Sequence, residues 1–188
     1  MAERTIAAAG EQEAFLAPSF AAADLHDPVA GGPLRDELAR RLVVKDTEFH
    51  SLGLVLGYDY PDSPVVVPDG RPVPAPGLAT YTPSAHPGAR LPHIWLPDGR
   101  SLYDALGDGF TLLRLAEDAD TRPLADAAAR RSAPLDVLDL STLPGLEERY
   151  GAALVLVRPD QHVAWRGGRA EDPDTVLARV LGDGVPAA

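Results

Sequence analysis

The stretch ALVLVRPDQHVAWRG, residues 153–167, decides the fold. Ala153–Val157 is an apolar run with the length of a buried strand, and His162–Arg166 has the composition of a partner strand. Between them, Pro159 stands at the second position of a four-residue turn, where its fixed φ suits a type I turn. Because a connection this short joins antiparallel neighbours, the sequence predicts a β-hairpin here.

A helix is predicted directly after the hairpin. Asp172 is a favourable N-cap, Pro173 suits the first turn, and Gly182 suits the end of a helix. The residues between them carry one apolar stripe at helical spacing, made of Val176, Leu177, Val180 and Leu181. The chain is therefore expected to end in the order ββα.

Two further strands and two helices are predicted before the hairpin. Phe110–Leu115 and Leu135–Leu140 are apolar strands, with an Ala-rich helix at Pro123–Arg131 between them and a short helix at Leu146–Tyr150 after them. A helical connection between successive strands favours parallel pairing. The order βαβαββα is that of a thioredoxin-like α/β domain, which the sequence places at residues 95–188.

Residues 1–94 are expected to form an arm and a Pro-rich connector ahead of this domain. Pro33–Leu42 predicts a helix, because proline stands first, acids come early, arginines come late and leucines recur every fourth residue. Met1–Leu16 is rich in Ala and Glu and predicts a weaker helix. The arm thus begins with helical segments.

In the segment Phe49–Tyr60 the spacing of the apolar residues changes from helical to alternating. Leucines and then Tyr58 alternate with smaller residues, which predicts a strand with one glycine-rich face. Val65–Val67 is its expected pairing partner. Prolines recur from Pro68 to Pro92 and forbid regular structure, so this part is expected to be an extended connector.

The composition excludes several classes of function. Of 188 residues, 45% are hydrophobic and 24% charged, values typical of a globular protein, and no apolar run approaches the length of a membrane span, so a cytoplasmic location is expected. A net charge of −11 without a basic stripe argues against nucleic acid. The lack of cysteine excludes thiol catalysis, disulfides and the Cys-x-x-Cys chemistry of redox thioredoxins.

Several stretches resemble the C-terminal region of FAD-dependent aromatic hydroxylases, the single-component monooxygenases that include polyketide and rifampicin hydroxylases. In chain order they are Glu3–Thr5, Glu48–Gly53, Pro87–Leu96, Asp98–Asp104, Gly109–Arg114, Leu154–Asp160 and His162–Gly167. They occur in the family's order and extend over nearly the whole chain. The resemblance implies a thioredoxin-like accessory domain that packs on a flavin-binding domain and contributes to dimers.

The flavin site of that family has no counterpart in this sequence. FAD is bound at a Gly-x-Gly-x-x-Gly turn between a strand and a helix, and the nearest patterns, Gly107–Gly109 and Gly182–Gly184, lack the third glycine. We interpret them as turn or cap glycines. No catalytic or cofactor residue is therefore expected in this chain, which is not expected to be an enzyme by itself, and FAD is expected only on a missing or separate flavin domain.

No metal or hydrolytic site is predicted either. His86, His93 and Asp98 fit no ligand spacing, and a local hydrogen bond of His93 beside Trp95 is the preferred interpretation. No Gly-x-Ser-x-Gly elbow marks a nucleophile. The clustered acids fall at element ends, where caps and solvated faces explain them: Glu117, Asp118, Asp120, Glu147, Glu148, Glu171 and Asp172.

The candidate functional residues are those of an interface. Trp165 lies in a predicted strand and is expected in the core, whereas Trp95 is either an interface anchor or an ordinary packing residue. The full candidate set is Arg90, Pro92, His93 and Trp95 in the connector, and Leu52, Leu54, Leu56 and Tyr58 in the predicted strand. The expected partner is a flavin-binding domain or subunit, or a second copy associating through the arm. The alternative function is a free-standing thioredoxin-fold interaction module with no link to hydroxylation.

Overall fold

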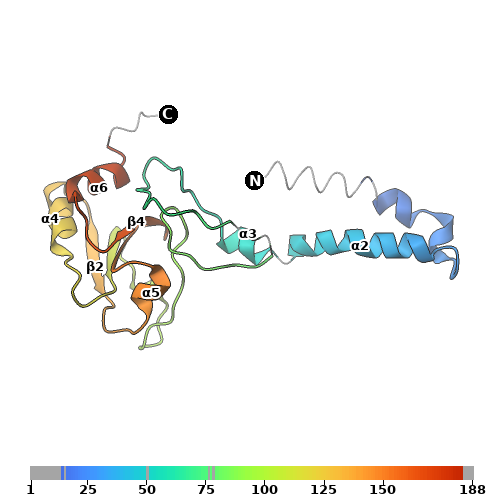
Figure 1. Ribbon diagram of the computed structural model, residues 1–188, viewed down its shortest axis with the longest axis horizontal. Coiled ribbons are helices and arrows are strands. Elements are labelled where there is room, and N and C mark those ends of the chain that lie inside the picture. The colour runs from blue at the N-terminus through green and yellow to red at the C-terminus, as the bar shows by residue number, and fades with distance from the viewer. Residues whose placement is uncertain (1–13, 15, 50, 76, 78, 184–188) are drawn as a thin grey trace. The chain divides into compact units, whose positions relative to one another are not determined.

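The computed structural model describes residues 14, 16–49, 51–75, 77 and 79–183 (Figure 1). The chain divides into two compact units, residues 1–51 and 52–188, and each is described by itself. The helix predicted over Met1–Leu16 falls almost wholly outside the described residues. The functional division at residues 94 and 95 stays a prediction.

The first unit contains a short 3-10 helix, η1 (Ala23–His26), and a long helix, α2 (Gly32–Phe49). The predicted helix at Pro33–Leu42 is confirmed but extends further, because neither glycine nor proline follows Pro33 before Gly53. Arg35 fixes the turn before α2 by donating hydrogen bonds to the backbone oxygens of residues 25, 27 and 28.

The second unit is built on a four-stranded sheet. Its strands are β1 (Phe110–Arg114), β2 (Leu135–Asp139), β3 (Leu154–Val157) and β4 (Val163–Gly167). They lie in the order β2-β1-β3-β4, with β1 and β2 parallel and the other two pairs antiparallel. The predicted thioredoxin-like topology is therefore confirmed.

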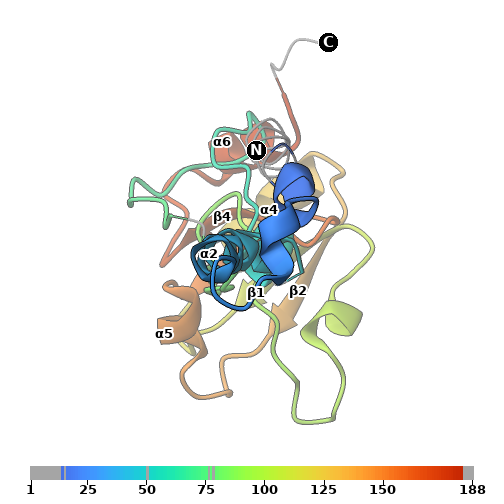
Figure 2. The same cartoon turned by 90° about the vertical axis from the view of Figure 1, so that its right-hand side faces the viewer.

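Helices cover both faces of this sheet. Figures 1 and 2 show α4 (Arg122–Arg130) and α6 (Pro173–Val180) together on one side and α5 (Leu146–Tyr150) on the other. Successive side chains of a strand point to opposite faces, so the sheet separates two apolar cores. The core under α4 and α6 includes Leu112, Leu124, Leu154, Leu156, Trp165 and Leu177, and the core under α5 includes Leu91, Leu102, Leu113, Tyr150, Val155 and Val157.

The hairpin between β3 and β4 forms as predicted. The Gln161 backbone N–H donates to the Arg158 oxygen at 2.9 Å, which closes the four-residue turn. Gln161 itself has a φ of 67°, and the strand register shifts between Leu156 and Val157. The turn is therefore followed by a bulge, which increases the local twist.

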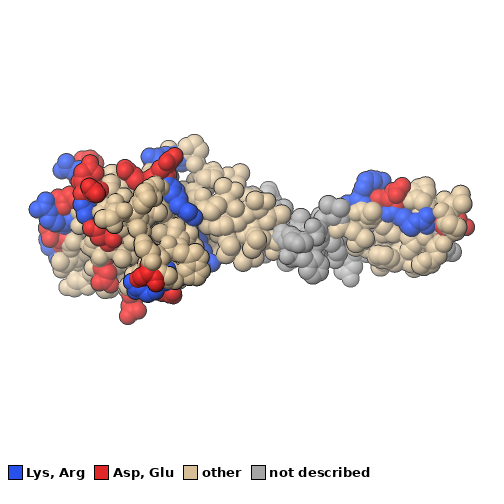
Figure 3. Space-filling model, turned by 90° about the horizontal axis from the view of Figure 1, so that it is seen from below, with Lys and Arg blue, Asp and Glu red and all other residues tan. Residues whose placement is uncertain are grey.

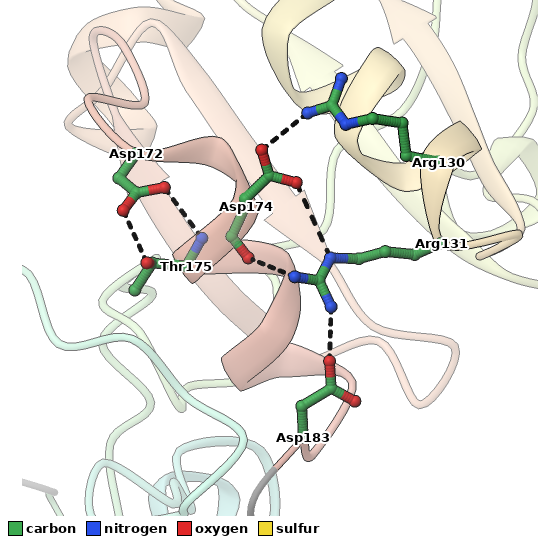
Figure 4. Close-up of polar contacts among 6 residues, drawn as sticks. All are labelled: Arg130, Arg131, Asp172, Asp174, Thr175 and Asp183. Atoms are coloured by element: carbon green, nitrogen blue, oxygen red, sulfur yellow. Dashed lines mark hydrogen bonds and ion pairs between the residues drawn. The ribbon is translucent and has the colours of Figure 1, made fainter.

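Helix α6 is capped and tied to α4 by polar side chains (Figure 4). The Asp172 carboxylate accepts hydrogen bonds from the Thr175 backbone N–H at 3.0 Å and from its hydroxyl at 2.6 Å, as expected of an N-cap. Asp174 pairs with Arg130 at 2.8 Å. Arg131 donates to the Asp174 backbone oxygen and pairs with Asp183 beyond the end of α6. These contacts hold both ends of α6 against α4.

Arg131→Met is expected to lower the free energy of unfolding by about 0.5–1 kcal/mol, because its ion pairs are partly exposed. The loss should shrink at molar salt, where charges are screened. Urea denaturation at low and at high salt measures both effects. Arg100→Met, which removes a pair only two residues apart, is the control. A loss that is equal at both salt concentrations would show that Arg131 acts through packing.

The strand predicted at Phe49–Tyr60 is wrong. Phe49 ends α2, and Leu52–Leu56 forms the short helix α3. Gly53 and Gly57 are one helical turn apart, and the Gly57 N–H donates to the Gly53 oxygen at 2.9 Å. The backbone of Gly77 and Thr80 lies so close to Gly53 that a Cβ would not fit. The glycine at position 53 allows the backbone of Gly77 and Thr80 to approach α3 closely. The alternating leucines belong to this helix and do not form a strand.

The predicted pairing of Val65–Val67 with that segment is also wrong, because α3 offers no strand edge. Instead, the Val67 backbone N–H donates to the Ala164 oxygen on β4 at 2.8 Å, and Val66 is fully buried. The connector from Pro68 to Pro92 contains no helix or named strand among its described residues. Its last part nevertheless belongs to the core, since Ala85 and Leu91 are buried there.

Among the residues that the structure describes, no helix combines the length and the apolar character needed to cross a lipid bilayer.

Candidate functional site

Trp95 stands on a tight turn at the surface. It pairs with Ser101 in an antiparallel bridge, and the Leu96 N–H donates to the Arg100 oxygen at 2.9 Å. Gly99 makes the turn possible with a φ of 83°. The indole is 71% exposed on this fixed support. This exposure fits the interface interpretation of Trp95, whereas Trp165 is buried as predicted.

A row of ring contacts continues inward from Trp95. The His93 ring lies 4.9 Å from the indole at an interplanar angle of 85°, and 5.3 Å from the Tyr103 ring. His93 Nε2 lies 2.9 Å from Ser101 Oγ, which confirms the predicted local hydrogen bond. The Arg90 guanidinium lies 5.1 Å from the centre of the Tyr103 ring, a cation–π distance. Burial raises the pKa of Tyr103, against the opposing effect of Arg90, so its hydroxyl stays protonated and donates to the Leu91 oxygen.

The row is extended by a backbone pairing between distant segments. Arg90 forms an antiparallel bridge with His162, directly before β4, and Asp59 forms one with Ala89. The His162 ring lies 5.4 Å from the rings of both Tyr58 and Tyr60. We call this row of residues, which is buried at His162, the aromatic strip, defined as Tyr58, Tyr60, His162, Arg90, Tyr103, His93 and Trp95.

The other predicted interface residues are distributed differently. Pro92 is buried, and its oxygen accepts a hydrogen bond from Tyr150 at 2.6 Å, so it supports the strip from within. Leu52 is exposed on α3, whereas Leu54 and Leu56 are half-buried. Val55 and Tyr60, both exposed, were not among the residues predicted from the sequence. The helical spacing of Leu52 and Val55 could have indicated a shared exposed face.

His162 was not among the candidates, although its environment is unusual. Its Nδ1 lies 3.0 Å from the Asp160 backbone oxygen, which can only accept, so Nδ1 carries the proton. Among the described residues, His162 Nε2 is the one buried side-chain nitrogen or oxygen without a hydrogen-bond partner. This leaves Nε2 enclosed beside Tyr58 and Tyr60.

His86 forms a chain of contacts that resembles a hydrolytic triad. Its Nε2 lies 2.7 Å from Asp59 Oδ2 and its Nδ1 lies 3.1 Å from Ser84 Oγ. However, Ser84 is only two residues away and also accepts a hydrogen bond from the His86 backbone N–H, an arrangement typical of a local turn. We therefore interpret the buried His86–Asp59 pair as a pin that holds the segment after α3 on the domain.

The residues weighed as a metal site are not brought together. His86 contacts Asp59 and Ser84, His93 contacts Ser101, and Asp98 pairs with Arg100. Within the described ranges, no group of three or more metal-binding side chains is present. The acids predicted at element ends include the Asp172 cap and Asp120, whose pKa is lowered to about 2 by hydrogen bonds from Arg122.

The first strand-to-helix connection does not fit a dinucleotide. A pyrophosphate requires glycines and free N–H groups at the helix N-terminus that follows the strand. Here residues 115–121, between β1 and α4, contain no glycine but three acids, Glu117, Asp118 and Asp120. Gly107 and Gly109 instead lie against Asp136 and Pro134 at the start of β2. The described residues therefore offer FAD no cradle at this position.

These observations define a thioredoxin-like domain whose candidate site is an interface. Residues 84–184, more than half of the chain, match the family described as "Aromatic-ring hydroxylase, C-terminal". The chain belongs to this family. The resemblance found in the sequence is thereby confirmed.

The chain is similar to several monooxygenases. It is 35% identical to the FAD-dependent monooxygenase apdD of Emericella nidulans over 81% of this chain and 26% of that protein. It is 33% identical to a phenol 2-monooxygenase of a Pseudomonas species (80% and 28%), and 40% identical to the tetracenomycin B2 monooxygenase-dioxygenase of Streptomyces olivaceus (78% and 28%). The chain thus spans between a quarter and a third of each relative's length.

Solved structures agree with this similarity. The substrate-free rebeccamycin biosynthetic enzyme RebC matches with a TM-score of 0.67 at 33% identity, over 86% of this chain and 30% of that one. The flavin-dependent monooxygenase PieE, in complex with FAD and substrate, matches with a TM-score of 0.67 at 33% identity, over 84% and 31%. Both matches are longer than residues 84–184, so they include part of the chain ahead of the family match.

Proposed function

We propose that this chain serves as the accessory C-terminal domain or subunit of an FAD-dependent aromatic-ring monooxygenase. Its role is structural: it docks on a flavin-binding domain, and the flavin and the oxidation chemistry belong to that partner. The similarity to the C-terminal domain of aromatic-ring hydroxylases supports this role, as does the small share of each relative that the chain spans. The acidic β1–α4 connection, which does not suit a pyrophosphate, is consistent with it.

The observation that carries the proposal is an exposed apolar surface on the second unit. Leu52 and Val55 on α3 are 60% and 56% exposed, and Tyr60, four residues after the end of α3, is 53% exposed; we call these three residues the α3 face. Figure 3 shows that charged side chains are dense at the end of this unit that carries α4 and α6 and sparse toward α3. Large apolar side chains that are exposed in a region poor in charge mark interaction sites. A flavin-binding domain is the occupant that the family similarity favours.

Binding to a flavin-containing partner tests this proposal. The partner is apdD expressed without the quarter of its length that matches this chain and loaded with FAD. On mixing, we expect flavin absorbance to co-elute with the 188-residue chain in size-exclusion chromatography. Val55→Glu should weaken the complex at least about tenfold, because it places a charge in an apolar contact.

Val137→Glu is the matched control, since Val137 is also an exposed valine but lies on the edge strand β2. It should leave the complex intact. Absence of co-elution, or equal weakening by both substitutions, would favour the free-standing interaction module instead. Self-association through the arm stays a separate prediction, which sedimentation of the chain alone at increasing concentration measures.

A further inference from the structure

A hollow of about 450 Å³ lies beside Trp95, and no residue of the α3 face lines it. The hollow is a surface depression open to solvent, and its volume suits a small ligand that it would enclose only in part. The hollow lies between the segment around Trp95 and the residues that lead into α5. Its lining is Ile94, Trp95, Pro97, Leu143, Pro144 and Leu146, with two polar residues, His93 and Arg149.

Trp95 offers this hollow a fixed aromatic surface. Its backbone is held by the bridge to Ser101, and its ring is in edge contact with His93. His93 is itself fixed by Ser101 Oγ and by the Tyr103 ring. Because the backbone bridge and the His93 ring restrict Trp95, which is 71% exposed, a flat ligand can stack on its indole at a reduced entropic cost.

Arg149 brings a positive charge to the same hollow. One of its N–H groups donates to the His93 oxygen at 3.2 Å. It forms no ion pair with any described carboxylate, and the neighbouring Glu147 and Glu148 do not pair with it. No described carboxylate neutralises this guanidinium, and guanidinium binds carboxylates in a directed geometry.

We propose that this hollow is a binding site for a small aromatic carboxylate. The aromatic ring stacks on Trp95 over the apolar lining, and the carboxylate accepts hydrogen bonds from Arg149. A neutral aromatic would leave the guanidinium unpaired, and an aliphatic acid would leave the indole uncovered. The site involves no residue of the α3 face, so it does not depend on the proposed docking.

Nuclear magnetic resonance of the ¹⁵N-labelled full chain tests this site with benzoate as the probe. The chain has two tryptophans, of which only Trp95 is exposed, so two indole N–H signals report separately. We expect benzoate to shift the Trp95 signal saturably, with a dissociation constant on the order of 1 mM, and to leave Trp165 unchanged. Trp95→Phe assigns the signal.

Comparing ligands and variants separates the contribution of stacking on Trp95 from that of the Arg149 hydrogen bonds. Arg149→Met should weaken benzoate binding about tenfold, Arg149→Lys less, and Arg122→Met, which changes an exposed side chain at the start of α4, not at all. Benzyl alcohol and acetate should each bind at least about tenfold more weakly than benzoate. Equal binding of benzoate and benzyl alcohol would overturn the role of Arg149. A Trp95 signal that responds to protein concentration and not to benzoate would show that a second copy covers the hollow.

Discussion

Gly88→Ala is expected to destabilise the second unit by about 3 kcal/mol, the combined cost of backbone strain and steric conflict. Gly88 has a φ of 95°, which side chains disfavour. A Cβ would also lie 2.6–2.8 Å from backbone atoms of Tyr60 and Pro61. Since neither partner is a flexible side-chain end, the backbone itself would have to move.

The structural disturbance should be largest where the backbone of Gly88 pairs with Tyr60 and Val163. The Gly88 N–H donates to the Val163 oxygen, and its own oxygen accepts from the Tyr60 N–H. An added Cβ pushes Tyr60 away and breaks this pairing. Because Tyr60 also belongs to the α3 face, Gly88→Ala should weaken docking to the flavin-containing partner as well as folding.

Gly99→Ala is the control for this prediction. Gly99 also has a positive φ, 83°, but no atom lies within 4 Å of an added Cβ. Gly99→Ala therefore adds only backbone strain, which should lower the free energy of unfolding by about 1 kcal/mol. Urea denaturation measures the loss of unfolding free energy in both variants. Faster amide hydrogen exchange at Tyr60 in Gly88→Ala would locate the disturbance. If the two variants lose the same free energy of unfolding, the backbone near Gly88 accommodates the added Cβ without a steric penalty.

Local patterns in the sequence were sufficient to predict most of the second unit. The β3–β4 hairpin was predictable because an apolar run, a turn proline and a second run are adjacent in the chain. Helix α6 was predictable because Asp172 and Gly182 mark its two ends. Both elements depend on neighbours within a few residues, where period and capping residues carry the information.

The candidate site was only partly predictable, because distant segments build it. Helix α3 was mistaken for a strand, since the backbone of Gly77 and Thr80, against which Gly53 packs, lies more than 20 residues away in the sequence. Trp95 was identified from its residue type. Tyr60 and His162 join it only through the pairing of residues 88–91 with β4, for which the sequence shows no local signal.

Arg166→Met is expected to cost about 3 kcal/mol at neutral pH, because it leaves a carboxylate with little solvent and no cation. Arg166 Nε donates to Asp69 Oδ2 at 2.7 Å, and the two side chains are only 10% and 13% exposed. Arg166 also donates to the Tyr150 oxygen at 3.0 Å, beside Arg71, which donates to the Gly151 oxygen. The pair therefore fixes the connector to β4 and to the end of α5.

The pH dependence shows whether charge causes this loss. Burial by itself raises the pKa of Asp69, but hydrogen bonds from the Arg71 N–H and the Arg166 side chain outweigh it, so the pKa lies below its ordinary value of 3.8. A lowered folded-state pKa stabilises the protein above 3.8, and this contribution disappears as the pH falls below that value. Without Arg166, the burial of Asp69 favours its protonated form.

The difference in unfolding free energy between wild type and Arg166→Met should therefore be largest near pH 7 and shrink below about pH 4, where a protonated Asp69 needs no cation. Urea denaturation at both pH values measures this, with Arg122→Met, an exposed pair, as a control whose unfolding midpoint should match wild type. If the difference is the same at both pH values, Arg166 stabilises the connector by packing alone, and the buried ion pair does not hold it.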